Sequence, residues 1–156
     1  MIYPIKPLNG IVIITQRFGE DPTYYKRFNY KGHNGLDFRA KIGTPIFSVW
    51  NGKISVIGDQ GSKGWGKFVK IAHGGGTETL YAHLSQFKVS KVGKAISGGS
   101  KIGLAGNTGN SRGSHLHFGL RWKNWKINNG YGGYTNPLPA LKKNNPKVKL
   151  SFPYDK

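Results

Sequence analysis

The chain has 156 residues, enough for one domain with a sizeable core, and 37% of them are hydrophobic, which favours a folded protein over a disordered one. It carries 24 Lys and Arg against 6 Asp and Glu, a formal net charge of +18, so we expect an anionic partner: nucleic acid, an anionic membrane surface or an anionic cell wall. The absence of cysteine excludes disulfides, thiolate nucleophiles and cysteine-ligated zinc.

The first half of the chain contains several short segments typical of strands. Residues 11–15 form a β-branched run and predict a buried strand, whereas residues 19–32, polar and aromatic, predict a loop. Residues 46–49, 53–57 and 68–72 predict further strands. Asn51-Gly52, between the first two of these, is a strong signal for a hairpin turn.

The second half continues the pattern, with strands expected at residues 79–84 and 101–105 and glycine-rich loops around them. No apolar run approaches the ~20 residues that a membrane span needs. We therefore expect a mainly β fold with little helix, built on an antiparallel sheet core in sandwich or barrel form. The expected organisation is one domain over residues 1–140 and a basic C-terminal tail over residues 141–156.

Residues 114–118 hold two of the five histidines in the pattern Ser-His-Leu-His-Phe. The alternation predicts a strand on which His115 and His117 share one face while Leu116 and Phe118 pack behind. Two imidazoles this close favour either a metal site with a neighbouring acid or base, or a pair that faces nucleic acid. A His-x-His pair alone is weak evidence for either.

The remaining acidic and histidine residues narrow the chemistry. No pair of carboxylates lies on an evidently structured scaffold, as glycoside hydrolysis requires, and neither a His-Glu-x-x-His helix nor a phosphate-binding Gly-rich loop occurs. His33 and Asp37 lie four residues apart, and Gly35 between them disfavours a helix. Together with His117 they predict a zinc site of two histidines and one carboxylate, whose fourth position stays open for water. His83 and His115 then remain as candidates for proton transfer.

Three ordered motifs carry a resemblance to a known family: His33-x-x-x-Asp37, Tyr81-Ala-His83-Leu-Ser, and Gly109-x-Ser-x-Gly-x-His115-Leu-His117-Phe. They resemble the lysostaphin-type (LytM-like) zinc endopeptidases that cut peptidoglycan peptides, over roughly residues 33–141. The resemblance implies one zinc per chain, held by His33, Asp37 and His117. Zinc-bound water would attack the carbonyl, with the catalytic histidines His83 and His115 as acid/base and oxyanion groups. It also implies an antiparallel β core in which long loops form a groove over the zinc.

The chain departs from the family pattern at two places. Members often carry an acidic residue soon after the His-Leu-His-Phe run, where this chain has Gly119-Leu120-Arg121. The tyrosine that the family uses near the oxyanion has three candidates here, Tyr24, Tyr25 and Tyr30. The other residues that we expect in the substrate groove are Asn107 and Trp122.

The family resemblance implies a bacteriolytic enzyme that acts at the bacterial cell wall, in the periplasm or outside the cell. We expect peptidoglycan as substrate, attraction of the basic face to an anionic envelope surface, no nucleic acid partner, and a monomer. The first residues lack an apolar segment of signal-peptide length. Export is therefore expected through holin-like release of a phage lysin, through virion delivery, or from a longer secreted enzyme. The alternatives are a catalytically inactive wall-binding module and a basic β domain that binds nucleic acid.

Overall fold

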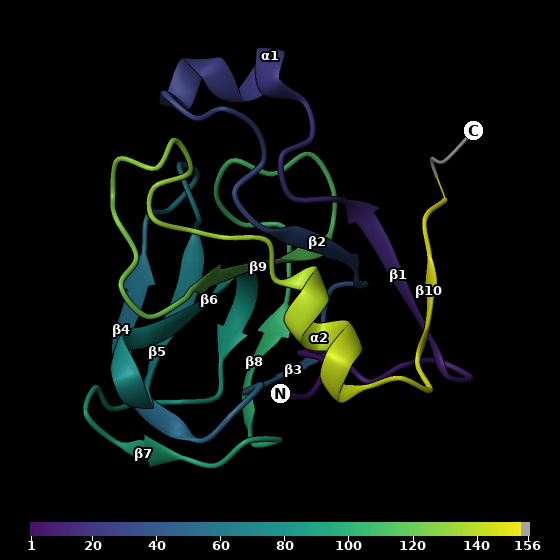
Figure 1. Ribbon diagram of the computed structural model, residues 1–156. Coiled ribbons are helices and arrows are strands. Elements are labelled where there is room, and N and C mark those ends of the chain that lie inside the picture. Colours follow the sequence, from purple (N-terminus) through teal and green to yellow (C-terminus); the bar gives the residue numbers. More distant parts are fainter. Residues whose placement is uncertain (154–156) are drawn as a thin grey trace.

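The computed structural model describes residues 1–153 and shows a mainly β fold (Figure 1). The strands are β1 (Ile11–Gln16), β2 (Leu36–Arg39), β3 (Pro45–Phe47), β4 (Gly52–Asp59), β5 (Lys67–His73), β6 (Thr77–Phe87), β7 (Ala95–Ile96), β8 (Lys101–Ala105), β9 (His115–Arg121) and β10 (Lys149–Ser151). The helices are short: α1 (Pro22–Tyr25), α2 (Leu138–Asn144), and the 3₁₀ turns η1 (Lys26–Phe28) and η2 (Gly74–Gly76).

The strands form one sheet in the order β10-β1-β2-β9-β6-β5-β4-β7, and β8 joins β6 to β3. All pairs are antiparallel except β1 with β10, so the sheet is mixed. The expected β fold with little helix is confirmed, and the sheet stays open rather than closing into a barrel. None of the described helices is long and apolar enough to cross a membrane.

The core lies behind the central strands. Leu36 and Phe38 on β2 and Leu116 and Phe118 on β9 are fully buried, and Phe38 and Phe118 are in ring contact at 6.3 Å. The alternate residues of these two strands, which include His115 and His117, point to the opposite face. The predicted division of the His-x-His strand into a histidine face and a packed face is therefore confirmed.

One local expectation needs correction. Asn51-Gly52 does not form a hairpin, because β3 pairs with β8 and β4 pairs with β5 and β7. The Asn51 side chain instead accepts a hydrogen bond from the Gly98 backbone, and the Asn51 backbone carbonyl accepts one from His73 Nδ1. Asn51-Gly52 therefore lies at a bend, which hydrogen bonds to residues distant in the sequence hold in place.

The expected domain boundary at residues 140/141 falls inside α2. Leu141 is fully buried in the core, and β10 runs parallel to β1 with Leu150 opposite Val12. Residues 141–153 are thus part of the packed domain; residues 154–156 of the expected tail lie outside the described residues.

Candidate metal centre and active site

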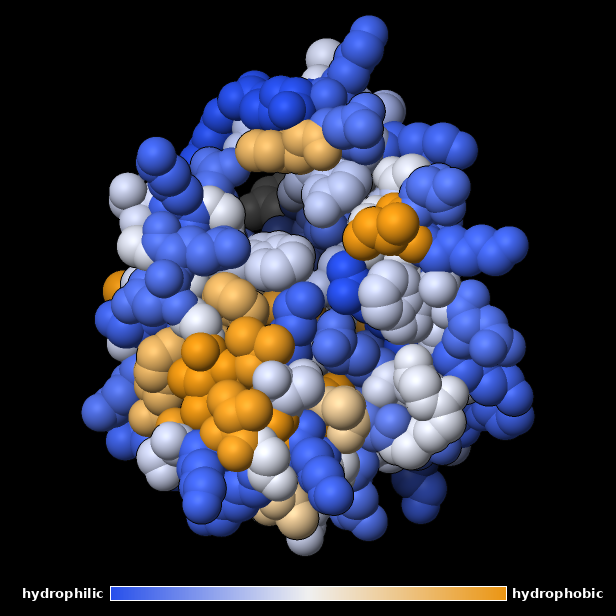
Figure 2. Space-filling view, turned by 90° about the vertical axis from the view of Figure 1, so that its left-hand side faces the viewer, coloured by the Kyte–Doolittle hydropathy of each residue, from blue (hydrophilic) through white to orange (hydrophobic). Residues whose placement is uncertain are grey.

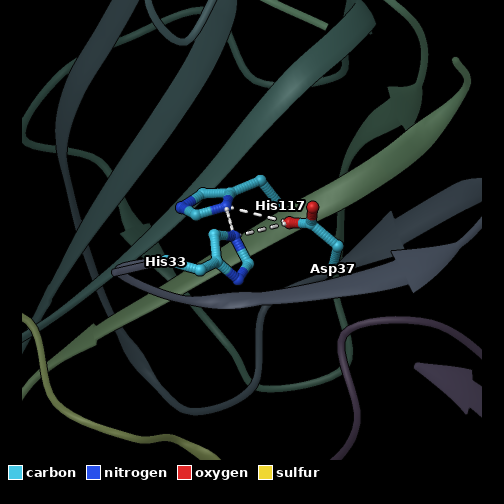
Figure 3. A group of neighbouring side chains, drawn as sticks. All are labelled: His33, Asp37 and His117. Atoms are coloured by element: carbon cyan, nitrogen blue, oxygen red, sulfur yellow. Dashed lines mark hydrogen bonds and ion pairs between the residues drawn. The ribbon is translucent and has the colours of Figure 1, made fainter. Parts of the chain in front are cut away.

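Three donor atoms converge on the histidine face of the sheet. His33 Nε2, Asp37 Oδ1 and His117 Nδ1 lie 3.0 to 3.1 Å from one another (Figure 3). All three residues are buried. A tetrahedral zinc with bonds of about 2.0 Å to nitrogen and oxygen holds its ligands about 3.3 Å apart, so this spacing fits zinc.

Strand register brings the three residues together. Asp37 on β2 is directly opposite His117 on β9, and facing residues of an antiparallel pair project to the same side. His33 comes from the segment that leads into β2, and Gly35 lets that segment approach β9 closely. A Cβ at Gly35 would lie 2.6 Å from both His117 Cε1 and the Phe118 carbonyl oxygen. Residues 33–35 thus lead into β2 without forming a helix, as Gly35 predicts.

Hydrogen bonds around the site determine which ring nitrogen of His33 is free to bind a metal. His33 Nδ1 lies 3.0 Å from the Arg17 carbonyl oxygen, which can only accept, so Nδ1 carries the proton and Nε2 of the neutral ring has a free lone pair. His117 Nε2 is buried and has no hydrogen-bond partner among the described residues. Two imidazoles that face a buried carboxylate need a positive charge between them, which a proton or a metal cation supplies, and this donor set is one that zinc uses.

The electrostatics of the site favour a cation. Burial would raise the pKa of Asp37, but the adjacent His33 and the hydrogen bonds to His117 and His33 hold that pKa well below its usual range. Burial lowers the pKa of His33, but Asp37 outweighs it and the net pKa is raised. Burial lowers the pKa of His117. The site therefore presents an ionised carboxylate beside two nitrogen ligands.

His83 and His115 lie next to this site, with ring centroids 4.7 Å apart. His83 Nδ1 donates to the Thr108 carbonyl oxygen at 2.7 Å, and His115 Nδ1 donates to the Gly113 carbonyl oxygen at 2.8 Å. Both rings thus keep Nε2 for other partners, and His115 Nε2 lies 3.5 Å from Asp37 Oδ2. Burial, followed by the proximity of His117 and His115, lowers the pKa of His83 to about 3, so this ring is neutral at physiological pH.

A bulge directs His83 out of its strand. β6 pairs with β9 as far as Ala82 and with β8 from Leu84 onward, and His83 between them has a φ of 61°. A left-handed conformation at a residue other than glycine is strained, and such strain is common at functional sites. The backbone N–H of His83 donates to the Trp65 carbonyl at 2.9 Å, which holds the bulge in place.

Residues 109–113 have the pattern Gly-x-Ser-x-Gly, which is typical of the turn that carries a serine nucleophile. Ser111 Oγ lies 3.3 Å from His115 Nδ1. The segment is a loop rather than a strand-to-helix turn. Because His115 Nδ1 donates to Gly113, it has no lone pair with which to take the Ser111 proton. Ser111 instead lies 2.6 Å from Asn107 Oδ1, so the geometry does not activate it as a nucleophile.

A groove of about 1090 Å³ is lined by four of the five site residues, Asp37, His83, His115 and His117, while His33 lies buried beneath it. Figure 2 shows the molecule hollowed near the top of the view, at the height of α1. The groove lining includes Tyr24, Tyr25 and Tyr30 but neither Asn107 nor Trp122. Asn107 bonds Ser111 within its own loop, and Trp122 packs against Trp50, with ring centroids 5.8 Å apart.

Two of the three tyrosines, Tyr24 and Tyr25, lie side by side in the groove, with ring centroids 5.1 Å apart. The Tyr25 ring lies 5.3 Å from that of His33, and its hydroxyl donates to Gln16 Oε1 at 3.0 Å. Tyr24 accepts a hydrogen bond from Asn110 Nδ2 at 3.2 Å, which ties α1 to the opposite loop. Tyr25 is thus the tyrosine in ring contact with a proposed ligand.

Sequence reasoning missed several residues of the site. Thr108, which supplies the carbonyl partner of His83, lies between two recognised motifs. Gln16 and Arg39 line the groove from β1 and β2. For Arg39 a signal was present, because it lies two residues after Asp37 on a strand and therefore projects to the same face.

Comparison with known proteins places this geometry in a family. The model of the peptidase family M23 matches residues 31–129, a range that contains all five site residues. The chain belongs to peptidase family M23. The lysostaphin-type resemblance drawn from the three motifs is therefore confirmed.

Other M23 proteins are similar over different extents. The peptidoglycan DD-endopeptidase ShyA of Vibrio cholerae is 42% identical over 88 residues, 56% of this chain and 20% of ShyA. The catalytic domain of the antimicrobial peptidase lysostaphin from Staphylococcus simulans is 33% identical, with a TM-score of 0.63 over 72% of this chain and 80% of that one. A zinc-containing peptidase from Vibrio cholerae is 26% identical, with a TM-score of 0.61 over 96% of this chain and 41% of that one. The chain spans about a fifth of the length of the first curated relatives that it matches.

Proposed function

We propose that this M23 domain is a zinc-dependent endopeptidase that hydrolyses peptide bonds of bacterial peptidoglycan. The observation that carries the proposal is the triangle of donor atoms from His33, Asp37 and His117 beside two histidines anchored through Nδ1. The name of ShyA, a peptidoglycan DD-endopeptidase, supports the substrate.

His33 Nε2, Asp37 Oδ1 and His117 Nδ1 are the proposed ligands. When bound, zinc supplies a Lewis acid for the peptide carbonyl and lowers the pKa of water at its open position. The hydrogen bond from His33 to the Arg17 carbonyl fixes the tautomer that binds metal. Loss of any one ligand leaves two, which is too few for a tightly held zinc.

His83 and His115 are the proposed proton carriers. Each ring has its Nδ1 proton held by a backbone carbonyl, so Nε2 is the atom that accepts a proton and returns it to the leaving amine. The low pKa of His83 keeps Nε2 unprotonated at neutral pH. The two rings are in contact, which allows them to act on the same peptide bond from neighbouring positions.

The groove walls position the peptide chain. α1 with Tyr24 and Tyr25 forms one wall, and the loop of residues 106–114 forms the other. The Asn110–Tyr24 hydrogen bond joins these walls, so a substrate enters along the groove.

The proposed site of action is the bacterial cell wall. The net charge of +18 attracts the domain to an anionic envelope surface, which suits a lytic enzyme such as a phage lysin, and the proposed form is a monomer.

Digestion of purified sacculi of defined cross-link type, with mass spectrometry of the released muropeptides, tests the proposal. Release of new amino termini from peptide cross-links or stems supports it, and their position gives the bond that is cut. A wall-binding module that has no activity would bind the sacculi and release nothing, and a nucleic-acid-binding domain would do neither.

A further inference from the structure

The groove differs from the rest of the surface in its basic residues. The chain has 19 lysines and five arginines. Among residues 1–153, those that line the groove include Arg39 and Arg112 but no lysine. Arginine presents a planar fork of donors that matches a carboxylate in two parallel hydrogen bonds, whereas lysine acts as a point charge.

Arg39 lies next to the proposed catalytic centre. In the β2–β9 pair it is directly opposite His115, and Asp37 is opposite His117. Facing residues of an antiparallel pair have Cβ atoms about 5 Å apart on the same side of the sheet. The Arg39 backbone position is therefore beside that of His115, a proposed proton carrier.

The acidic groups of the groove are already engaged. Glu20 accepts a hydrogen bond from the Arg17 backbone at 2.7 Å, and Asp21 accepts one from the Tyr24 backbone at 3.2 Å. Asp37 belongs to the metal centre. Within residues 1–153, Arg39 makes no ion pair and is exposed, although it lies in the groove.

Arg112 supplies a second positive charge in the groove, from the loop opposite α1. Its guanidinium lies 5.3 Å from the centre of the Tyr24 ring. This stacking orients the side chain without neutralising its charge. An anion bound in the groove therefore has two arginines near it, Arg39 on the sheet and Arg112 on the loop.

We propose that Arg39, supported by Arg112, binds a carboxylate of the substrate peptide next to the scissile bond. This inference rests on the proposed function and refines it. The preferred substrate is a stem or cross-link peptide that carries a free carboxylate close to the cut, rather than a neutral glycine bridge. The carboxylate can belong to a side chain or to a chain end, since both have the same fork-matching chemistry.

The test uses matched synthetic peptides that contain the bond cut in sacculi. One peptide carries a carboxylate on the residue next to that bond and its partner carries the carboxamide; a second pair makes the same change at the C-terminal end. We expect the zinc-loaded protein to show a kcat/KM about 10- to 100-fold higher for the carboxylate form of one pair, as a charge-assisted bond requires. The pair that shows the preference identifies the source of the carboxylate.

In R39Q, the ratio of kcat/KM for the carboxylate form to that for the carboxamide form of the preferred pair should fall close to one. R39K should give an intermediate ratio, because lysine keeps the charge without the fork of donors. The control K53Q removes an equal charge from exposed Lys53 on β4, outside the groove lining, and should keep the ratio. Zinc content and melting temperature of each variant show that the protein is folded. An unchanged ratio in folded R39Q, or no preference in either pair, overturns the inference while cleavage of the peptides leaves the proposed function intact. Failure to cut any peptide or sacculus overturns the proposed function itself.

Discussion

The His83 ring is held by the backbone of Thr108, whose carbonyl oxygen accepts the Nδ1 proton at 2.7 Å. The Thr108 hydroxyl is in turn fixed on both sides. It accepts a hydrogen bond from the Lys67 backbone at 3.0 Å and donates to the Leu84 carbonyl at 2.7 Å. One threonine thus connects the loop over the groove to β5 and to β6, the strand that carries His83.

We expect T108V to lower kcat by about 10- to 100-fold, because a misplaced proton carrier loses part of the effect of general acid–base catalysis. Zinc content should stay at one per chain, since Thr108 contacts none of the three proposed ligands. T108S keeps the hydroxyl and should restore most of kcat. A T108S variant as impaired as T108V would show that the methyl group matters and that the hydroxyl does not.

A second tightly packed point supports the same loop. A Cβ at Gly66 would lie 2.4 Å from the Gly109 nitrogen, and Gly66 has a φ of 58°. We expect G66A to reduce both the melting temperature and kcat, because the added Cβ separates the loops that position His83. G61A is a matched control, since Gly61 also has a positive φ of 64° but nothing within 4 Å of the added Cβ. Equal loss of activity in the two variants would contradict this packing argument.

Acidification should weaken the fold through His73. This ring is buried, its Nδ1 donates to the Asn51 carbonyl and its Nε2 lies 2.8 Å from Thr79 Oγ1. Burial lowers its pKa in the folded state, despite the Asn51 contact and the charge of Glu78. The unfolded chain therefore binds more protons below pH of about 6.5, so stability falls as pH falls through that value.

Chemical denaturation at pH 8 and pH 5 measures this effect. The wild-type protein should lose more free energy of unfolding between these pH values than H73N, which has no titrating ring. The difference between the two proteins cancels the contribution of the other histidines. Equal losses would remove His73 as the cause.

The metal site was the part of the structure most accessible from sequence. Alternation around Leu116 and Phe118 sets which face the two histidines share, and this face was predicted correctly. The meeting of His33 with His117 is a long-range contact, and it was inferred from the short list of residues able to bind zinc and then from the family motifs, rather than from local pattern. The role of Gly35 at that contact is visible only once β9 lies against it.

Other features depend on partners that local sequence does not specify. The Asn51-Gly52 turn signal was strong, yet the strands around it find other neighbours. Residues 141–153 have a tail-like composition, but Leu141 is buried in the core and Leu150 pairs with Val12 on β1. The positive φ of His83 arises where β6 changes partner, a property of the sheet and not of the residues beside it.

The net charge of the chain predicts that lysis of whole cells depends on salt concentration. If the charge of +18 draws the protein to the wall, lysis of whole cells should fall steeply as salt rises. Screening acts over a Debye length of about 8 Å at physiological ionic strength, so the long-range attraction is lost first. Cleavage of a small neutral peptide should change little over the same range. Equal salt sensitivity of both substrates would exclude electrostatic targeting.

The division of the histidines into ligands and proton carriers is the central claim. Zinc content and turnover of sacculi, measured side by side for H117A and H115A, test it most directly. H117A should lose both zinc and activity, because His117 Nδ1 belongs to the donor triangle. H115A should keep one zinc per chain while kcat falls by about 10²–10⁴-fold, the usual size of a proton-transfer effect. An H115A protein that loses zinc while H117A retains it would contradict the account and exchange the two roles.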